Sequence, residues 1–174
     1  RSYDMWNGYY TWISNVNYIL AEEETMSGSE TEKNYVLGQA YAVRAYSYFM
    51  LAQMFSRTYK GHESEPCVPL YTEPTDIATE GKGRATVEEV YQQITSDLDK
   101  AITMLGNSGK RKHISHINEA VASGIKARVA LVMEDWQTAL DAANAAISKS
   151  GCSIGTGTAV TGGMNDATAN NVMW

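Results

Sequence analysis

The chain has 174 residues, of which 44% are hydrophobic and 20% charged, as is typical of a globular domain with its own core. Its 14 lysines and arginines stand against 20 aspartates and glutamates, so no basic excess exists to neutralise a nucleic-acid backbone. No apolar run approaches the ~20 residues of a membrane-spanning helix. We therefore expect no nucleic-acid partner and no helix that spans a membrane.

The first predicted helix covers residues 4–24. Apolar side chains recur there at the three- and four-residue spacing of one helical face: Trp6, Tyr10, Ile13, Val16 and Leu20. Asn17 interrupts this face one turn after Ile13. Because a buried amide needs hydrogen-bond partners, we expect Asn17 to bond the backbone of an adjacent loop and to tie the first hairpin to the rest of the chain.

The second predicted helix covers residues 33–56. It carries one bulky and one small stripe, each with a seven-residue repeat: Tyr41, Tyr48 and Phe55, and Gly38, Ala45 and Ala52. A neighbouring helix can approach the small stripe closely while the rings fill the groove beside it. The next segment, residues 57–84, contains all three prolines and has no helical period, so we predict a long ordered loop without secondary structure.

Three more helices are predicted after the loop, over residues 86–105, 115–134 and 136–149. Thr86 and Glu89 form the pattern of a capping box at the start of the first. Ser115 and Asp135 can cap the other two, and Gly151 can end the last. The pattern divides the chain into a helical core, residues 1–151, and an irregular tail, residues 152–174.

The predicted fold class is therefore all-α: antiparallel helical hairpins that resemble tetratricopeptide-type repeats, with a long proline-containing loop and an irregular tail. Three segments in the first half carry a narrower resemblance: Trp6-x3-Tyr10-x2-Ile13-x3-Asn17, Gly38-Gln39-Ala40-x3-Arg44-Ala45-Tyr46-x-Tyr48-Phe49, and Val68-Pro69-Leu70. Three follow in the second half: Arg84-Ala85-Thr86-Val87-x2-Val90-Tyr91-x2-Ile94-x2-Asp97-Leu98-x2-Ala101, Ala127-Arg128-Val129-x-Leu131, and Trp136-x2-Ala139.

In this order the six segments resemble the helical core of the SusD/RagB family. Gln39 stands where the family usually has Glu, and Ser56 stands where a Gly commonly follows the phenylalanine. The resemblance implies a surface-exposed outer-membrane lipoprotein of Bacteroidetes-type bacteria, attached to the membrane only through a lipid anchor that these 174 residues lack. Such a protein captures glycans or other nutrients and acts as a lid on a TonB-dependent (SusC-like) transporter.

The resemblance also implies that the chain is part of a longer protein. Family members begin with a lipobox cysteine and continue past the helices into an irregular region that starts near residues 170–174. Much of the family's ligand pocket is built from segments outside these 174 residues. The resemblance therefore assigns no ligand-binding residue, glycan or individual transporter to this chain, and it leaves the oligomeric state open.

Catalytic and cofactor sites have little support in the sequence. His113, His116 and Glu119 share one helical face, but no fourth metal ligand is suggested. Cys67 and Cys152 have neither zinc-ligand spacing nor a nearby histidine, and their redox state stays open. The glycines of residues 155–163 lack a phosphate-binding motif, and the oxygen donors of residues 165–170 lack calcium-loop spacing. We expect no enzyme activity, no cofactor and no metal.

The chain has 11 tyrosines, 4 tryptophans and 2 phenylalanines, which matter because sugar rings stack on exposed aromatic rings. Most of these rings lie at helix-packing spacing and are expected to fill the core or the grooves between helices: Tyr41, Tyr48, Phe49, Tyr91 and Trp136 among them. Tyr59 and Tyr71 lie in the long loop and are the two candidates for ligand or partner contact.

Arg44 and Arg128 lie among alanines on predicted inner faces. A buried guanidinium without a partner costs several kcal/mol, so each is expected to act as a hydrogen-bonded structural brace. For Arg128 the expected partner is a carboxylate or helix-end carbonyls, with Asp97 the first choice.

The sequence thus favours nutrient or glycan binding and delivery to a transporter, with this chain as the helical scaffold. The alternative is a tetratricopeptide-type adaptor that binds proteins and has no carbohydrate role. A hydrolase is disfavoured because no acid/base constellation is present. Because the rings mostly take packing positions, we expect these 174 residues alone to bind oligosaccharides weakly or not at all.

Overall fold

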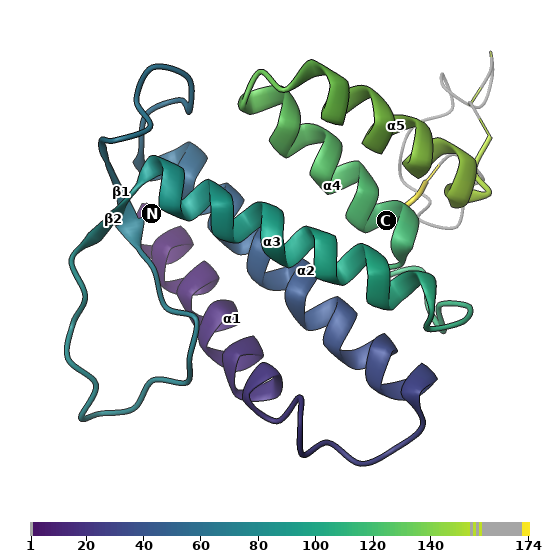
Figure 1. Cartoon of the computed structure of the whole chain (residues 1–174), viewed down its shortest axis with the longest axis horizontal. Helices are drawn as coiled ribbons and strands as arrows, with labels where there is room; N and C mark the ends of the chain where they lie inside the picture. The colour runs from purple at the N-terminus through teal and green to yellow at the C-terminus, as the bar shows by residue number, and fades with distance from the viewer. Residues whose placement is uncertain (1, 154, 156, 158–171) are drawn as a thin grey trace.

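The computed structural model describes residues 2–153, 155, 157 and 172–174. Five helices and two short strands make up the described part (Figure 1): α1 (Ser2–Ala21), α2 (Glu30–Phe55), β1 (Pro66–Pro69), β2 (Arg84–Thr86), α3 (Val87–Gly106), α4 (Glu119–Val132) and α5 (Trp136–Ser150). The prediction of a mainly helical fold is confirmed.

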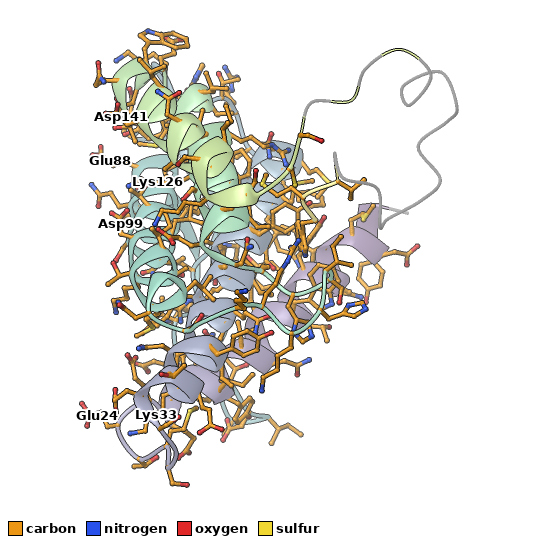
Figure 2. The ribbon with its side chains drawn as sticks, turned by 90° about the vertical axis from the view of Figure 1, so that its right-hand side faces the viewer. Glu24, Lys33, Glu88, Asp99, Lys126 and Asp141 are labelled. Atoms are coloured by element: carbon orange, nitrogen blue, oxygen red, sulfur yellow. The ribbon has the colours of Figure 1, made fainter. Side chains whose placement is uncertain are left out.

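Each helix packs against the next one along the chain, from α1 to α5 (Figure 1). The long helix α2 lies between α1 and α3, and α4 covers part of α3 and touches α2. Within the described residues, the only helix that α5 contacts is α4. Figure 2 views the molecule from the side and shows Asp99 of α3 and Lys126 of α4 side by side, where they form an ion pair.

The core is centred on α2, as its two stripes predict. Tyr48 and Phe49 are fully buried, and so are Ala45 and Ala52 of the small stripe. They pack against apolar side chains of the strands and the next two helices: Cys67, Val68, Val87, Val90, Tyr91, Ile94, Leu98, Val121, Ile125 and Val129. Small residues on α2 therefore let α3 lie close while the rings fill the remaining space.

The helix starts follow their caps. Thr86 and Glu89 make both bonds of the predicted capping box. Ser29 and Glu32 make a second one, so α2 begins at Glu30 and not at residue 33. The predicted start at residue 115 is wrong because Asn118 caps α4, while Ser115 pairs with His113 instead.

The segment predicted to be a long loop, residues 57–84, contains one short strand and the first residue of another, which its prolines argued against. β1 and β2 pair antiparallel, Pro66 opposite Thr86 and Pro69 opposite Arg84, with an irregular register between them. Each proline stands at an end of β1, where a missing N–H does least harm to the ladder. The prediction of a segment without secondary structure is therefore corrected: residues 70–83 form the loop, which we call the β1–β2 loop.

Most of the predicted tail, residues 154, 156 and 158–171, lies outside the described residues, as do the oxygen donors of residues 165–170. The described end of the chain returns to the helices. Arg111 Nη1 donates to the carbonyl of Met173 at 2.7 Å, and Trp174 Nε1 donates to the carbonyl of Ser115 at 2.9 Å. The division into a core of residues 1–151 and a tail stays a prediction.

The last hairpin is more exposed than its pattern suggests. Trp136 is 63% exposed, and Leu140 and Ile147 of the same helix, as well as Leu131 at the end of α4, are also exposed. Alanines bury the inner face of α5 instead: Ala139, Ala142 and Ala146. The packing role expected for Trp136 is therefore wrong. None of the described helices is both long and apolar enough to cross a membrane.

Candidate ligand-binding hollow between helix 1 and the loop

A buried ion pair lies beneath the β1–β2 loop. Arg44 of α2 and Asp97 of α3 meet through two parallel bonds, Nε to Oδ2 at 2.7 Å and Nη2 to Oδ1 at 2.8 Å, and the two side chains are 6% and 1% exposed. Gln93 donates a further bond to Asp97 Oδ1. Such bidentate, fully bonded geometry is what a buried charge pair needs to offset its desolvation.

The electrostatics of this pair favour the charged arginine. Burial by itself lowers the pKa of Arg44, but the hydrogen bonds and the charge of Asp97 outweigh that effect, so the pKa lies above its ordinary value. Arg44 is therefore a permanent cation at the centre of the helices. Its third nitrogen, Nη1, points away from Asp97 toward α1 and the loop.

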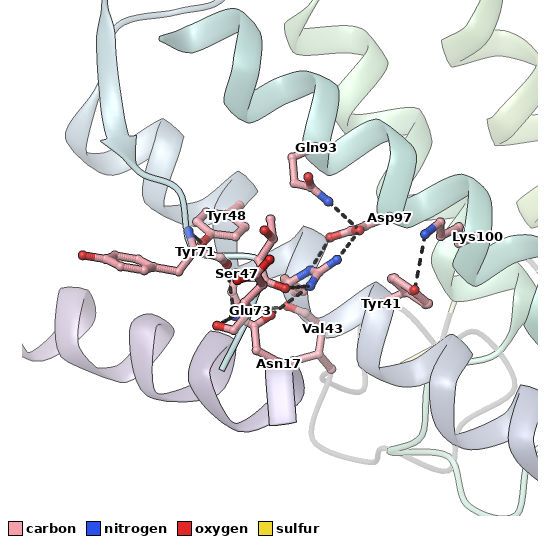
Figure 3. A network of polar contacts seen from close by, with 12 residues as sticks. Asn17, Tyr41, Val43, Ser47, Tyr48, Tyr71, Glu73, Gln93, Asp97 and Lys100 are labelled. Carbon is pink, nitrogen blue, oxygen red and sulfur yellow. Dashed lines mark hydrogen bonds and ion pairs between the residues drawn. The ribbon is translucent and has the colours of Figure 1, made fainter. Parts of the chain in front are cut away.

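That nitrogen connects the ion pair to the loop (Figure 3). Arg44 Nη1 donates to Asn17 Oδ1 at 2.8 Å and to the Thr72 carbonyl at 3.1 Å. Asn17 Nδ2 in turn donates to the carbonyls of Tyr71 and Glu73, at 3.0 and 3.1 Å. The expected bonds from Asn17 to loop backbone are thus present, and buried polar groups of α1 and α2 fix three consecutive loop residues.

Tyrosines of α1 and α2 also hold this loop and the end of β1 before it. Tyr48 Oη donates to the Tyr71 carbonyl at 2.8 Å and accepts the Tyr71 N–H at 2.7 Å. From α1, Tyr10 Oη donates to the Pro69 carbonyl and Tyr18 Oη to the Thr75 carbonyl. Burial raises the pKa of both Tyr10 and Tyr48 above the ordinary range, so these hydroxyls stay protonated donors.

The loop does not close completely on α1 and leaves a hollow of about 190 Å³. Its walls combine aromatic, hydroxyl, amide and carboxylate groups: Tyr10, Ile13, Ser14, Asn17, Tyr71, Thr75, Asp76 and Thr79. This volume lies below the ~300–1,000 Å³ of pockets that hold drug-sized ligands. The hollow therefore suits one small polar unit and not an extended chain.

Asp76 supplies the carboxyl group in the lining of the hollow. Its Oδ1 accepts bonds from Thr79 Oγ1 and the Ala78 N–H, both at 2.9 Å. The bond from Thr79, and then that from Ala78, lower the pKa of Asp76, so it is a carboxylate at neutral pH. This carboxylate can accept hydrogen bonds from hydroxyl groups of a ligand.

The two aromatic candidates lie in different environments. Tyr71 lines the hollow: its ring meets Tyr10 edge-on with centroids 6.2 Å apart, and its hydroxyl accepts the Lys82 N–H. Tyr59 lies elsewhere, with its ring 5.1 Å from that of Tyr91, and burial raises its pKa. The structure thus keeps Tyr71 as a candidate for ligand contact and gives Tyr59 a packing position.

The expectation for Arg128 is wrong. The side chain is exposed, Arg44 occupies Asp97, and the Arg128 guanidinium lies 5.8 Å from the ring centroid of Phe49. The buried face of α4 includes Ala122 and Val129 and does not include Arg128. Alanines on several sides of this helix leave its buried face ambiguous in sequence, which explains the error.

The histidine cluster is engaged in other bonds. His113 Nδ1 pairs with Ser115 Oγ at 2.8 Å, His116 Nδ1 with Tyr35 Oη at 2.5 Å, and Glu119 with Lys149 at 3.1 Å. In the part of the chain that the structure describes, no group of three histidine, cysteine or acidic side chains could hold a metal ion.

Comparison with known families shows which protein family has this helical fold. A family model described as SusD-like, "Starch-binding associating with outer membrane", matches residues 1–131. The chain belongs to the SusD-like family. A comparison with curated proteins found no match.

Solved SusD-like structures share the fold. A SusD-like carbohydrate-binding protein from Bacteroides vulgatus is 28% identical, with a TM-score of 0.90 over 98% of this chain and 36% of its own. A SusD superfamily protein from Bacteroides thetaiotaomicron is 28% identical, with a TM-score of 0.76 over 87% of this chain and 33% of its own. A laminarin-binding SusD-like protein is 25% identical, with a TM-score of 0.66 over 84% and 30%. The chain thus spans about a third of the length of these SusD-like proteins.

Proposed function

We propose that this chain is the helical scaffold of a protein that binds glycans at the outer membrane and passes them to a TonB-dependent transporter. The observation that carries the proposal is the family match over residues 1–131, whose description names starch binding and the outer membrane. Relatives with the same fold that are named for carbohydrate or laminarin binding give further support. The protein acts by binding, without catalysis.

The finer parts of the proposal concern the whole protein. It is a surface-exposed lipoprotein that is anchored through a segment outside these 174 residues, and its partner is a SusC-like transporter. Within the chain, the Arg44–Asp97 pair fixes the β1–β2 loop, and the hollow beside it receives one polar unit of the ligand. Tyr71 supplies a ring wall of that hollow, and Asp76 supplies a carboxylate for the ligand's hydroxyl groups.

Isothermal titration calorimetry of two chain lengths tests this proposal. The 174-residue chain and a longer chain with flanking segments are titrated with a panel of host and plant glycans that includes maltoheptaose and laminarihexaose. The longer chain should bind at least one of them, and the short chain weakly or not at all. Affinity of the longer chain for peptides or proteins and for no glycan would contradict the proposal and favour the adaptor function.

Delivery to a transporter needs a separate measurement. The complete protein, purified from outer membranes in mild detergent, should bring a TonB-dependent transporter with it, and deletion of that transporter should abolish uptake of the bound glycan. Uptake that continues unchanged without the transporter would remove this part of the proposal and leave glycan binding untouched.

A further inference from the structure

Four aromatic rings form a continuous row on a face of the molecule away from the hollow. Trp12 and Tyr9 of α1 meet edge-on with centroids 5.4 Å apart, Tyr9 meets Tyr46 of α2 at 6.4 Å, and Tyr46 meets Trp174 at 5.7 Å. The two ends of the row are open to solvent, since Trp12 is 50% exposed and Trp174 is 49% exposed. Edge-to-face contacts brace the rings against one another and leave large aromatic faces in water.

A glycine lies on α1 one turn before Trp12. Gly8 is inside the helix, where glycine is unfavourable relative to alanine. Packing does not explain it, because a Cβ built on Gly8 would meet nothing within 4 Å. This contrasts with Gly38, where a Cβ would lie 2.7 Å from Leu105 Cγ.

The position of Gly8 matters because helical side chains lean toward the N-terminus of their helix. The surface beside the Trp12 ring is therefore the turn that carries Gly8, and the missing side chain leaves that surface flat. Asn15, one turn later on the same side, is exposed and offers an amide. A flat aromatic face with an amide at its edge matches a pyranose ring, which presents an apolar C–H face and a rim of hydroxyl groups.

The hollow lies on a different face of the same helix. The α1 residues that line it follow the three- and four-residue spacing of one stripe: Tyr10, Ile13, Ser14 and Asn17. Trp12 is on none of those positions. Tyr10 is already bonded to Pro69 of β1, and Asn17 to the β1–β2 loop. The row of rings is thus a second surface, independent of the loop.

We propose that this surface, the α1 platform of Gly8, Tyr9, Trp12, Asn15, Tyr46 and Trp174, is a saccharide-stacking site that holds successive pyranose rings of an oligosaccharide. The inference rests on the proposed function and deepens it, because it places part of the glycan contact on the helical scaffold. One pyranose ring stacks on Trp12 above Gly8 with its hydroxyl groups toward Asn15. The chain of sugars continues over the row toward Trp174.

The test measures binding of maltoheptaose and laminarihexaose to the complete protein by calorimetry and tryptophan fluorescence. Trp12→Ala should weaken binding of the preferred oligosaccharide roughly tenfold. Gly8→Leu is the sharper variant, because leucine favours a helix yet covers the flat surface. It should leave the melting temperature unchanged or higher while binding falls by a similar factor. Gly8→Ala should keep both the fold and the affinity.

Trp136→Ala is the matched control, since this tryptophan is exposed on α5, away from the row. It should bind both probes as the unaltered protein does. Equal loss in Trp136→Ala and Trp12→Ala would indicate unspecific stacking and overturn the platform. Full affinity in both Trp12→Ala and Gly8→Leu would also overturn it and leave glycan binding in place. No binding of any glycan by the unaltered protein would instead mean that the proposed function fails.

Discussion

Gly38 of α2 and Leu105 of α3 approach each other so closely that a Cβ on Gly38 would lie 2.7 Å from Leu105 Cγ. Met104 Cβ would be 3.2 Å away. The first member of the small stripe therefore sets how near the two central helices can lie, and a side chain at that position would prevent this approach.

Gly38→Ala should destabilise the fold by ~1–3 kcal/mol through overpacking, even though alanine favours a helix. Urea unfolding followed by circular dichroism measures the change. Gly8→Ala is the matched control, because its Cβ meets open space, and it should raise stability by ~0.5–1 kcal/mol. Equal effects at the two glycines would show that the helices separate without cost.

Breaking the Arg44–Asp97 ion pair should strongly destabilise the folded chain. Arg44→Met leaves the buried carboxylate of Asp97 unpaired, and Asp97→Asn leaves the buried cation of Arg44 without a charged partner. Each variant should lower the free energy of unfolding by about 3–5 kcal/mol. The double variant Arg44→Met/Asp97→Leu should cost clearly less than the sum of the single changes.

Arg128→Met serves as the control for these variants, since Arg128 is exposed. Its stability should stay within about 0.5 kcal/mol of the unaltered chain. A loss as large as that of Arg44→Met would mean that Arg128 braces the core after all.

Tyr48→Phe should loosen the β1–β2 loop without emptying the core. The ring stays, but the Tyr71 N–H and carbonyl lose their partner, at a cost of about 1–3 kcal/mol. Urea unfolding gives the cost, and faster proteolysis within residues 70–83 reports the loop. Tyr18→Phe removes an exposed bond to the same loop and should change stability by less than ~1 kcal/mol.

Stability should decline above pH 10, in part because of Tyr91. Burial, and then the charge of Cys67, raise the pKa of Tyr91 to about 12 in the folded chain, whereas an unfolded tyrosine titrates near ~10. Between these values the unfolded state has lost the proton and the folded state retains it. The contribution of Tyr91 to the free energy of unfolding is therefore complete below pH 10 and is lost as the pH rises to 12.

Each pH unit in that window should cost up to ~1.4 kcal/mol for this one group. Tyr91→Phe removes the titration, so its unfolding free energy should fall less steeply between pH 10 and 12 than that of the unaltered chain. Parallel curves for the two proteins would show that Tyr91 does not contribute.

Local signals make much of the frame predictable. Two features depend only on residues within one or two helical turns: the capping box of Thr86 and Glu89 and the two stripes of α2. Both can therefore be predicted from the sequence alone. The need of a buried Asn17 for partners also follows from its position within an apolar face. Asp97 does bind a buried arginine, as expected, but that arginine is Arg44 and not Arg128.

The remaining features depend on contacts between distant segments. Arg44 and Arg128 both stand among alanines, and only the packing of α2 and α4 against their neighbouring helices decides which of them is buried. The β1–β2 pair joins segments 15 to 20 residues apart, and the prolines at both ends of β1 argue against a strand there. The hollow and the row of rings likewise need α1, α2 and later segments in place, so no local pattern could have marked Trp12 or Gly8.

The end of α2 depends on a residue that the chain reaches much later. The Phe55 carbonyl accepts a bond from Arg84 Nη2 at 2.8 Å, and Arg84 Nε donates to the Cys67 carbonyl. Ser56 leaves the helix in an extended conformation, without the left-handed glycine that would terminate it locally. Arg84 therefore couples the last turn of α2 to the strand pair. We expect the amide protons of that turn to exchange with solvent together with those of the strands, and faster than those at the centre of the same helix.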